Sequence, residues 1–288
     1  MNEAQSIRLK DGRNLAYAQY GDPHGKPLFF FHGMPGSRFF RPPDEITVNH
    51  GVRLITLDRP GYGYSDFQTG RQILDWPDDV LQLAAALGIE RFAVAGHSGG
   101  GPYAAVCAYR LPQVLTAVAI LSGVGPVGAP AATRGMSLIN KLGFLFGRYI
   151  PWPVWQRLVA RVYRQDRTDL EQTLGRGAKR RPPADAEQMA NPAVRIVCYR
   201  SEVEAFRQGM LGLAWEARLL CRPWGFPLGA ISIPVLLWHG TEDRDTPVSM
   251  GQYVADRIMT IRATFCPGEA HLLLFSHWEE ILTAMFAH

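Results

Sequence analysis

The sequence predicts an α/β fold built on a mostly parallel sheet with helices on both faces. From Leu28 to Leu121, short apolar runs typical of buried strands alternate with segments of helical spacing, the pattern of a parallel sheet covered on both faces. A second α/β stretch runs from Ile233 to the C-terminus. Between them, over residues 125–230, the apolar spacing is helical and no convincing strand is present, so we expect a helical insertion.

The first predicted elements are a hairpin and a series of strands. Ile7–Lys10 and Leu15–Tyr20 flank Asp11-Gly12, a dipeptide typical of the tight turn between two paired strands. The strands that follow are predicted from apolar runs at residues 28–31, 53–57, 92–95, 234–238 and 263–266.

Helices are predicted where apolar residues recur every three or four positions. Those expected on the sheet are residues 80–87, 102–110 and 281–286, with Pro102 tolerated in the first turn of its helix. Those expected in the insertion, divided by joints that contain proline and glycine, are Ser137–Tyr149, Val154–Tyr163 and Val194–Leu220. The basic run Arg176–Arg181 is interpreted as a solvated loop rather than a phosphate- or membrane-binding site.

Composition excludes several classes of function. A chain of 288 residues that is 47% hydrophobic can bury a full core. Its 30 Lys and Arg against 26 Asp and Glu leave a charge of +4, too small and scattered to indicate nucleic-acid binding. The N-terminus has no apolar segment typical of a secretory signal, and glycine and proline divide the weakly charged stretch 92–130, so we expect no membrane contact. Without C-x-x-C spacing, Cys107, Cys198, Cys221 and Cys266 are expected to be reduced thiols of a cytoplasmic protein.

The strongest chemical signal is Gly96-His97-Ser98-Gly99-Gly100, which lies between a predicted strand and a predicted helix. A serine at such a turn matches the G-x-S-x-G pattern of a nucleophile elbow. The glycines are needed because the turn is too sharp for Cβ atoms beside a serine whose own backbone is strained. The serine hydroxyl then lies at a helix N-terminus, whose dipole favours a developing anion. A glycine-rich turn with a capping serine is the alternative interpretation.

Four further blocks begin where predicted strands end, the edge at which open α/β sheets place their sites. They are His32–Ser37, Asp58–Ser65, His239–Pro247 and Pro267–His271. With Ser98 they supply the chain order Ser, Asp, His that this architecture uses. On these motifs the chain resembles the α/β-hydrolase family, specifically its capped branch of esterases, lipases and C–C hydrolases. The resemblance runs from about residue 5 to the end, except for the middle third.

The resemblance implies an α/β-hydrolase fold with an eight-stranded sheet. It implies a core made of residues 1–124 and 231–288, with residues 125–230 inserted as a helical cap over the site. The aromatic residues of the cap are expected to form mainly its own core, with only some of them facing the cleft.

A serine needs an adjacent base to act as a nucleophile at neutral pH. Among the eight histidines, His271 is the predicted base, since it opens a loop between the last strand and the last helix. By position alone Glu242, Asp243 and Asp245 could each orient it. The resemblance implies Asp243, because the family pattern H-G-x-x-D-x-x-x-P puts the acid there. This acid would hold the imidazole tautomer and stabilise the imidazolium.

Acyl transfer also needs two donors for the tetrahedral oxyanion. The backbone N–H of Gly99 is one, and the resemblance implies that of Met34 as the other. His32, Gly33, Met34 and His97 are expected to surround the substrate. For His32 and His97 we favour support of the loops over a part in the chemistry.

We therefore expect a serine hydrolase that cleaves small to medium carboxylic esters through an acyl-enzyme, with no cofactor and no metal site. Ser98 replaces the aspartate of dehalogenases and epoxide hydrolases, and no metal or nucleotide motif is present. The alternatives are a C–C bond hydrolase, a cofactor-free perhydrolase and a receptor-like protein with little turnover. The expected partner is a small-molecule ester, and the protein is expected to be a monomer or homodimer. Asp58 and Arg59 are expected to brace the end of the sheet without chemistry.

Overall fold

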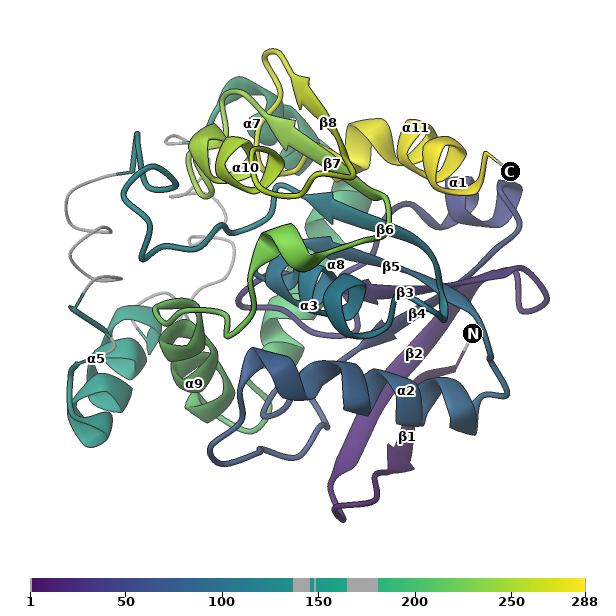
Figure 1. The fold of residues 1–288 in the computed structure, drawn as a ribbon. Helices are drawn as coiled ribbons and strands as arrows, with labels where there is room; N and C mark the ends of the chain where they lie inside the picture. The colour runs from purple at the N-terminus through teal and green to yellow at the C-terminus, as the bar shows by residue number, and fades with distance from the viewer. Residues whose placement is uncertain (1, 137–145, 148, 165–180, 288) are drawn as a thin grey trace.

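The computed structural model describes every residue except 1, 137–145, 148, 165–180 and 288. At its centre lies an eight-stranded sheet with the spatial order β1-β2-β4-β3-β5-β6-β7-β8 (Figure 1). In chain order the strands are β1 Asn2–Arg8, β2 Asn14–Gly21, β3 Lys26–Phe31, β4 Val52–Leu57, β5 Phe92–His97, β6 Leu115–Leu121, β7 Val235–Gly240 and β8 Ile261–Cys266.

The sheet is antiparallel only at one edge. β1 pairs with β2 through the predicted hairpin, β2 pairs antiparallel with β4, and the remaining neighbours are parallel. The predicted eight-stranded, mostly parallel sheet is therefore confirmed. Because parallel strands end at the same edge, the segments that follow β3, β4, β5, β7 and β8 gather there.

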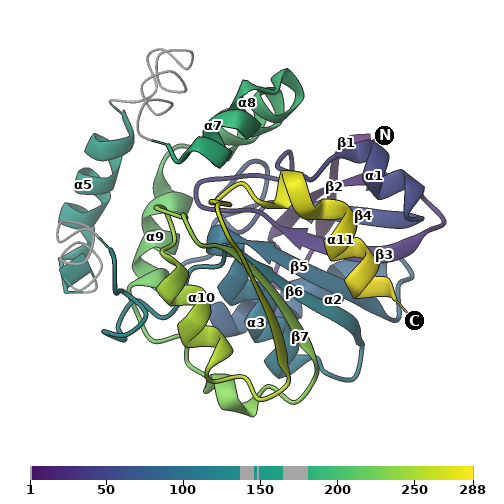
Figure 2. The same ribbon diagram turned by 90° about the horizontal axis from the view of Figure 1, so that it is seen from above.

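Helices cover both faces of the sheet (Figure 2). They are α1 Asp44–Asn49, α2 Trp76–Ala86, α3 Gly101–Arg110, α10 Val248–Ala255 and α11 Leu274–Phe286. α2, α3 and α10 pack on one face in a large apolar cluster, and α1 and α11 pack on the other face in a second cluster. Phe29 and Phe31 of β3 belong to the first cluster, whereas Leu28 and Phe30 belong to the second. This strand is buried on both sides, which explains its continuous apolar run.

Among the described residues, four α-helices with full bounds, the short 3-10 helix η3 Leu228–Ala230 and no strand lie between β6 and β7. The four α-helices are α5 Trp152–Arg164, α7 Pro183–Ala190, α8 Pro192–Ala205 and α9 Leu211–Leu220. In Figure 1, α5 and α9 lie on the side of the molecule opposite both chain termini. The predicted helix Val154–Tyr163 corresponds to α5.

Two predictions in this segment were incomplete. Val194–Leu220 is divided into α8 and α9, because the chain turns at Gly209, whose φ of 91° lies in the left-handed region. α7 was not predicted, and it begins at Pro183, a residue type that the first helical turn accepts. The predicted helix Ser137–Tyr149 lies largely outside the described residues, as does all of the basic run 176–181 except Arg181.

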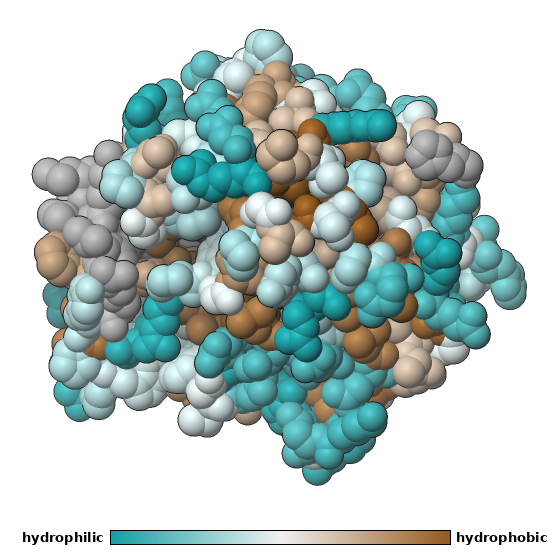
Figure 3. Space-filling view, viewed as in Figure 1, coloured by the Kyte–Doolittle hydropathy of each residue, from teal (hydrophilic) through white to brown (hydrophobic). Residues whose placement is uncertain are grey.

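The face of the molecule in Figure 3 does not separate into hydrophilic and hydrophobic halves. On the face in Figure 3, hydrophilic and hydrophobic residues are interspersed, in keeping with nearly balanced totals of charged residues. Of the helices described, none is long and apolar enough to cross a membrane. Cys107, Cys198, Cys221 and Cys266 carry free thiols.

Candidate active site

Ser98 lies at the turn between β5 and α3. Its φ of 54° is in the left-handed region, which a serine rarely adopts. The backbone is crowded here: a Cβ at Gly96 would collide with the carbonyl of Gly100, and a Cβ at Gly100 would collide with the carbonyl of Phe31. Glycine at both positions allows the bend, and the geometry is that of the predicted elbow.

His271 and Asp243 meet at the same edge of the sheet. Asp243 lies in the loop after β7, and His271 lies in the loop between β8 and α11. His271 Nδ1 is 2.9 Å from Asp243 Oδ2. Glu242 and Asp245 are exposed, whereas Asp243 is buried. Of the three competing carboxylates, Asp243 is the one whose side chain bonds the histidine.

The pair strongly favours a charged imidazole. Burial alone would lower the pKa of His271, but the charge and hydrogen bond of Asp243 raise it to about 9. Burial alone would raise the pKa of Asp243, but His271 lowers it well below its ordinary value. An imidazolium is the state that follows proton transfer from a serine, so this arrangement suits a base that must accept that proton.

The carboxylate of Asp243 is held by its own loop. Its Oδ1 accepts the backbone N–H groups of Asp245 at 2.9 Å and Thr246 at 2.8 Å. The Thr246 hydroxyl lies 2.7 Å from Asp243 Oδ2 and 2.9 Å from the carbonyl of Ser122. His239 donates from Nε2 to the carbonyl of Thr246 at 2.7 Å and so supports this loop. Sequence reasoning missed Thr246, whose only signal is its place between the acid and the proline of the motif.

His97 connects the serine turn to the histidine loop. Its Nε2 lies 2.9 Å from the carbonyl oxygen of His271, and because a carbonyl only accepts, this nitrogen carries the hydrogen. The two rings lie 4.8 Å apart, and His97 also stacks on Phe40. Burial lowers the pKa of His97 to about 3, so the ring is neutral. His97 is only 3% exposed, and contact between its ring and a substrate stays a prediction.

His97, the residue before Ser98, thus connects the serine turn to the loop of His271. Within the described part of the chain, no hydrogen bond joins the Ser98 hydroxyl to His271. Such bonds between nucleophile and base often tighten only when substrate is bound.

The segment after β3 lies directly beside Ser98. A Cβ at Gly33 would lie 3.6 Å from Ser98 Oγ, and a Cβ at Gly99 would lie 3.2 Å from the backbone nitrogen of Met34. The backbone nitrogens of Met34 and Gly99 therefore lie close together near the candidate nucleophile. His32 is buried below them, with Nδ1 2.7 Å from the carbonyl of Gly33, so its ring supports this loop as expected.

An apolar cluster from the middle segment reaches Met34, which is partly buried against it. The cluster's buried members are Tyr62, Val159, Ala205, Phe206, Leu213 and Ala214. All but Tyr62 come from α5, α8 or α9 or the residue that follows α8. The Met34 side chain therefore lies where the core and the middle segment meet.

Three buried carboxylates of the middle segment bind the core. Asp185 of α7 accepts the backbone N–H of Leu272 at 2.7 Å. Glu204 of α8 lies 2.8 Å from Arg38, and Glu216 of α9 lies 3.0 Å from Nη2 of Arg59. All three are at most 4% exposed. Sequence reasoning missed them, although Glu216 had a signal as a lone acid in the apolar helix Leu211–Leu220.

Arg59 and Asp58 brace the edge of the sheet, as expected. Asp58 accepts the backbone N–H of Arg38 at 2.6 Å, and it is fully buried. Burial raises the pKa of Asp58 to about 6, although Arg38 opposes that rise.

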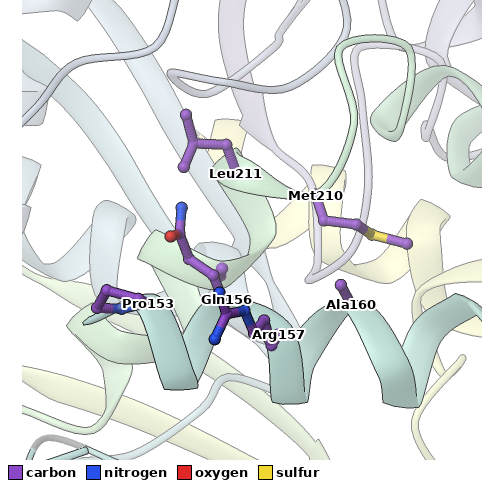
Figure 4. Close-up of a pocket in the computed structure, with 7 residues that line it drawn as sticks. Pro153, Gln156, Arg157, Ala160, Met210 and Leu211 are labelled. Carbon is purple, nitrogen blue, oxygen red and sulfur yellow. The ribbon is translucent and has the colours of Figure 1, made fainter. Parts of the chain in front are cut away.

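A separate pocket of about 340 Å³ lies between α5 and α9. Figure 4 shows Met210 and Leu211, at the start of α9, next to Gln156 and Arg157 of α5. Of its seven lining residues, Ala214 belongs to the apolar cluster that reaches Met34, and Met210 packs against that cluster. Within the described residues, no group of three or more His, Cys, Asp or Glu side chains could hold a metal ion.

Comparison with known proteins gives a family match. The model of a family described as the alpha/beta hydrolase fold matches residues 26–181. A non-heme chloroperoxidase of Streptomyces lividans is 33% identical over 139 residues, which are 45% of this chain and about half, 48%, of that protein. A bifunctional esterase/perhydrolase of Acinetobacter calcoaceticus is 26% identical over 276 residues, 92% of each chain. The structure of a hydrolase from Pseudomonas aeruginosa superposes with a TM-score of 0.72 at 20% identity, covering 100% of this chain and 99% of that one.

Proposed function

The chain belongs to the α/β-hydrolase fold family, and we propose that it is a serine hydrolase that cleaves small to medium carboxylic esters through an acyl-enzyme. The observation that carries the proposal is the His271–Asp243 pair, 2.9 Å apart, on the sheet edge where Ser98 occupies its strained turn. A buried histidine whose pKa is raised by a carboxylate is the base that a serine nucleophile needs.

The proposed reaction has two steps. His271 Nε2 takes the proton of Ser98 Oγ as Oγ bonds to the ester carbonyl carbon, and the C–O bond to the alcohol then breaks with return of that proton. Water, deprotonated by His271, then bonds to the acyl carbon; the bond from that carbon to Ser98 Oγ breaks, Oγ takes back the proton from His271, and the acid is released. Asp243 holds Nδ1–H throughout and keeps its own charge. The backbone N–H groups of Gly99 and Met34 donate to the oxyanion in both steps.

We assign substrate selectivity to residues 125–230, the proposed cap. The apolar cluster that reaches Met34 supports an apolar acyl or alcohol group as the preferred ligand. Each buried methylene contributes about 0.8 kcal/mol, so an apolar wall next to the nucleophile discriminates by chain length.

The test is turnover of p-nitrophenyl acetate and butyrate with rapid mixing. We expect a burst of p-nitrophenol equal to the enzyme concentration, followed by a slower steady state, because acylation and deacylation are separate steps. Ser98→Ala is the control and should show neither phase. Tight binding of esters with no burst would contradict the proposal and favour a receptor-like protein.

A second candidate is perhydrolysis, in which hydrogen peroxide replaces water and the acyl-enzyme yields a peracid. It is favoured by the similarity to the bifunctional esterase/perhydrolase, which extends over 92% of both chains. Peracid formation from an acetate ester and hydrogen peroxide, absent in Ser98→Ala, tests it. Consumption of a yellow dienol substrate instead of esters would indicate C–C bond hydrolysis.

A further inference from the structure

We propose that Arg59, held by Glu216 of α9, is a positioning residue that fixes the peptide group whose N–H donates to the oxyanion. The inference rests on the proposed function. It extends that function by making the cap part of the device that stabilises the transition state.

The first step of the argument is the geometry of one peptide group. The carbonyl of Gly33 and the N–H of Met34 belong to the same planar unit, and in a trans peptide they point in opposite directions. Arg59 Nη2 donates to the carbonyl of Gly33 at 2.8 Å, and Nη1 donates to the carbonyl of His32 at 2.6 Å. One rigid guanidinium thus holds two successive carbonyls. This fixes the direction of the Met34 N–H.

The second step is electronic. A hydrogen bond from a cation to a carbonyl withdraws electron density from the peptide group and strengthens its N–H as a donor. The carbonyl of Gly33 also faces Nδ1 of His32 at 2.7 Å. Arg59 therefore acts on the Met34 N–H without touching the substrate.

The third step is what holds Arg59. Its Nε and Nη2 both donate to the Glu216 carboxylate, and the Tyr62 hydroxyl donates to the same carboxylate at 2.6 Å. Arg59 also lies over the Tyr103 ring, 4.8 Å from its centroid. Although burial opposes ionisation, Arg59 and Arg71 lower the pKa of Glu216 to about 2. The ion pair therefore stays charged throughout the working range of a hydrolase.

A similar ion pair elsewhere in the molecule allows the positioning role to be distinguished from simple attachment of the cap to the core. Glu204 of α8 is also a buried carboxylate that binds a buried arginine of the core, Arg38. Arg38 bonds in turn to Asp58. Losing either pair weakens the contact between the middle segment and the core. Glu216 is the one whose arginine holds the carbonyls of His32 and Gly33.

The experiment compares the wild type with Glu216→Gln, Arg59→Lys and the control Glu204→Gln. Each is assayed with p-nitrophenyl butyrate and inhibited with phenylboronic acid, whose tetrahedral adduct with a serine places an oxygen where the oxyanion forms. Melting curves ensure that every variant is folded at the assay temperature.

In Glu216→Gln and Arg59→Lys we expect kcat to fall about 10- to 100-fold, KM to stay within about twofold, and the boronate Ki to rise in step with the loss of kcat. Glu204→Gln should lower the melting temperature and keep kcat and Ki within about twofold of wild type.

Several results would overturn the inference. Wild-type kcat and Ki in folded Glu216→Gln would do so, as would equal losses in Glu216→Gln and Glu204→Gln, or a change in KM alone. If Glu216→Gln does not fold, Tyr62→Phe removes one donor from Glu216 and leaves every charge in place. It should lower kcat about threefold and raise Ki equally, and no change in either would count against the inference. A wild type that neither turns over esters nor binds the boronate would instead refute the proposed function, and the inference with it.

Discussion

The core and the middle segment are held together by different kinds of contact. β5 is buried along its whole length, and the turn after it depends on glycines that let backbone segments touch. α7, α8 and α9 also pack apolar residues on the core, such as Met189, Val194 and Leu220, but they add polar contacts through the buried carboxylates Asp185, Glu204 and Glu216. Close packing fixes how near two segments lie, and ion pairs and hydrogen bonds add a fixed direction to the contact.

This difference predicts a hierarchy of effects. Changes at the strand ends of the core should remove the chemistry itself. Changes at Glu216 and Asp185 should alter how well the catalytic groups are positioned, whereas a change at Glu204 should alter stability alone. Changes in the apolar lining should alter only which substrate is preferred. The predictions follow that order of size.

The largest effect is expected from Ser98→Ala. Ester turnover should fall about 10⁴-fold or more, since the nucleophile is gone and only binding and the oxyanion donors remain. The melting temperature should stay close to wild type, because the hydroxyl adds little packing. Steady-state rates with p-nitrophenyl butyrate and a melting curve measure both quantities. A variant that keeps more than about a tenth of the rate would exclude Ser98 as the nucleophile.

Asp243→Asn should lower kcat about 10³- to 10⁴-fold, because an amide cannot both accept from His271 Nδ1–H and supply the charge that stabilises the imidazolium. Asp245→Asn is the matched control two residues away. Its side chain is exposed, so it should keep kcat within about twofold. The reverse pattern would show that Asp245 is the catalytic acid.

The pH profile tests the same pair without mutation. Only the neutral imidazole acts as a base, and Asp243 raises the pKa of His271 to about 9. The value of kcat/KM should therefore fall about tenfold for each pH unit below that pKa, with a midpoint above the ordinary histidine value of about 6.5. A rate that stays level from pH 9 down to pH 6 would contradict the raised pKa.

Prediction from sequence succeeded where one local rule determines the structure. Apolar runs locate β3 and β5 because strands buried on both faces need no polar positions. The glycines beside Ser98 predict a sharp turn because other residues would clash there. The contacts between the middle segment and the core could not be predicted, since Glu216 and Arg59 are 157 residues apart and no local pattern indicates that they meet. The contact between Asp185 of α7 and Leu272 could not be predicted for the same reason, and α7 itself was not predicted.

Asp185→Ala should have an intermediate effect. It leaves the partly buried N–H of Leu272 without this acceptor, which costs about 1 kcal/mol of folding stability and loosens the loop that carries His271. We expect a lower melting temperature and kcat reduced about tenfold. Asp185→Asn keeps an acceptor oxygen and should restore most of both. Equal losses in the alanine and asparagine variants would show that the charge of Asp185, not its hydrogen bond, is what matters.

The smallest effect, and the sharpest test of where selectivity lies, is expected from Met34→Ala. The Met34 side chain packs against the apolar cluster at the junction of core and cap, while its backbone N–H is the proposed oxyanion donor. Truncating the side chain should therefore leave turnover of the acetate ester within about twofold of wild type. The wild-type preference should rise about fourfold per methylene until the acyl chain meets the wall. In Met34→Ala that optimum should move to longer chains by about two or three carbons.

A panel of p-nitrophenyl esters from acetate to decanoate measures this shift. Met259→Ala is the control, because the Met259 side chain is 87% exposed and takes no part in the proposed site. An unchanged optimum in Met34→Ala would mean that the acyl group does not meet this side chain. A large loss with the acetate ester would mean that Met34 supports the loop more than it lines the pocket. Only a shift in optimum with the acetate rate kept would show that one residue serves both regions, its backbone belonging to the chemistry of the core and its side chain to the selectivity of the cap.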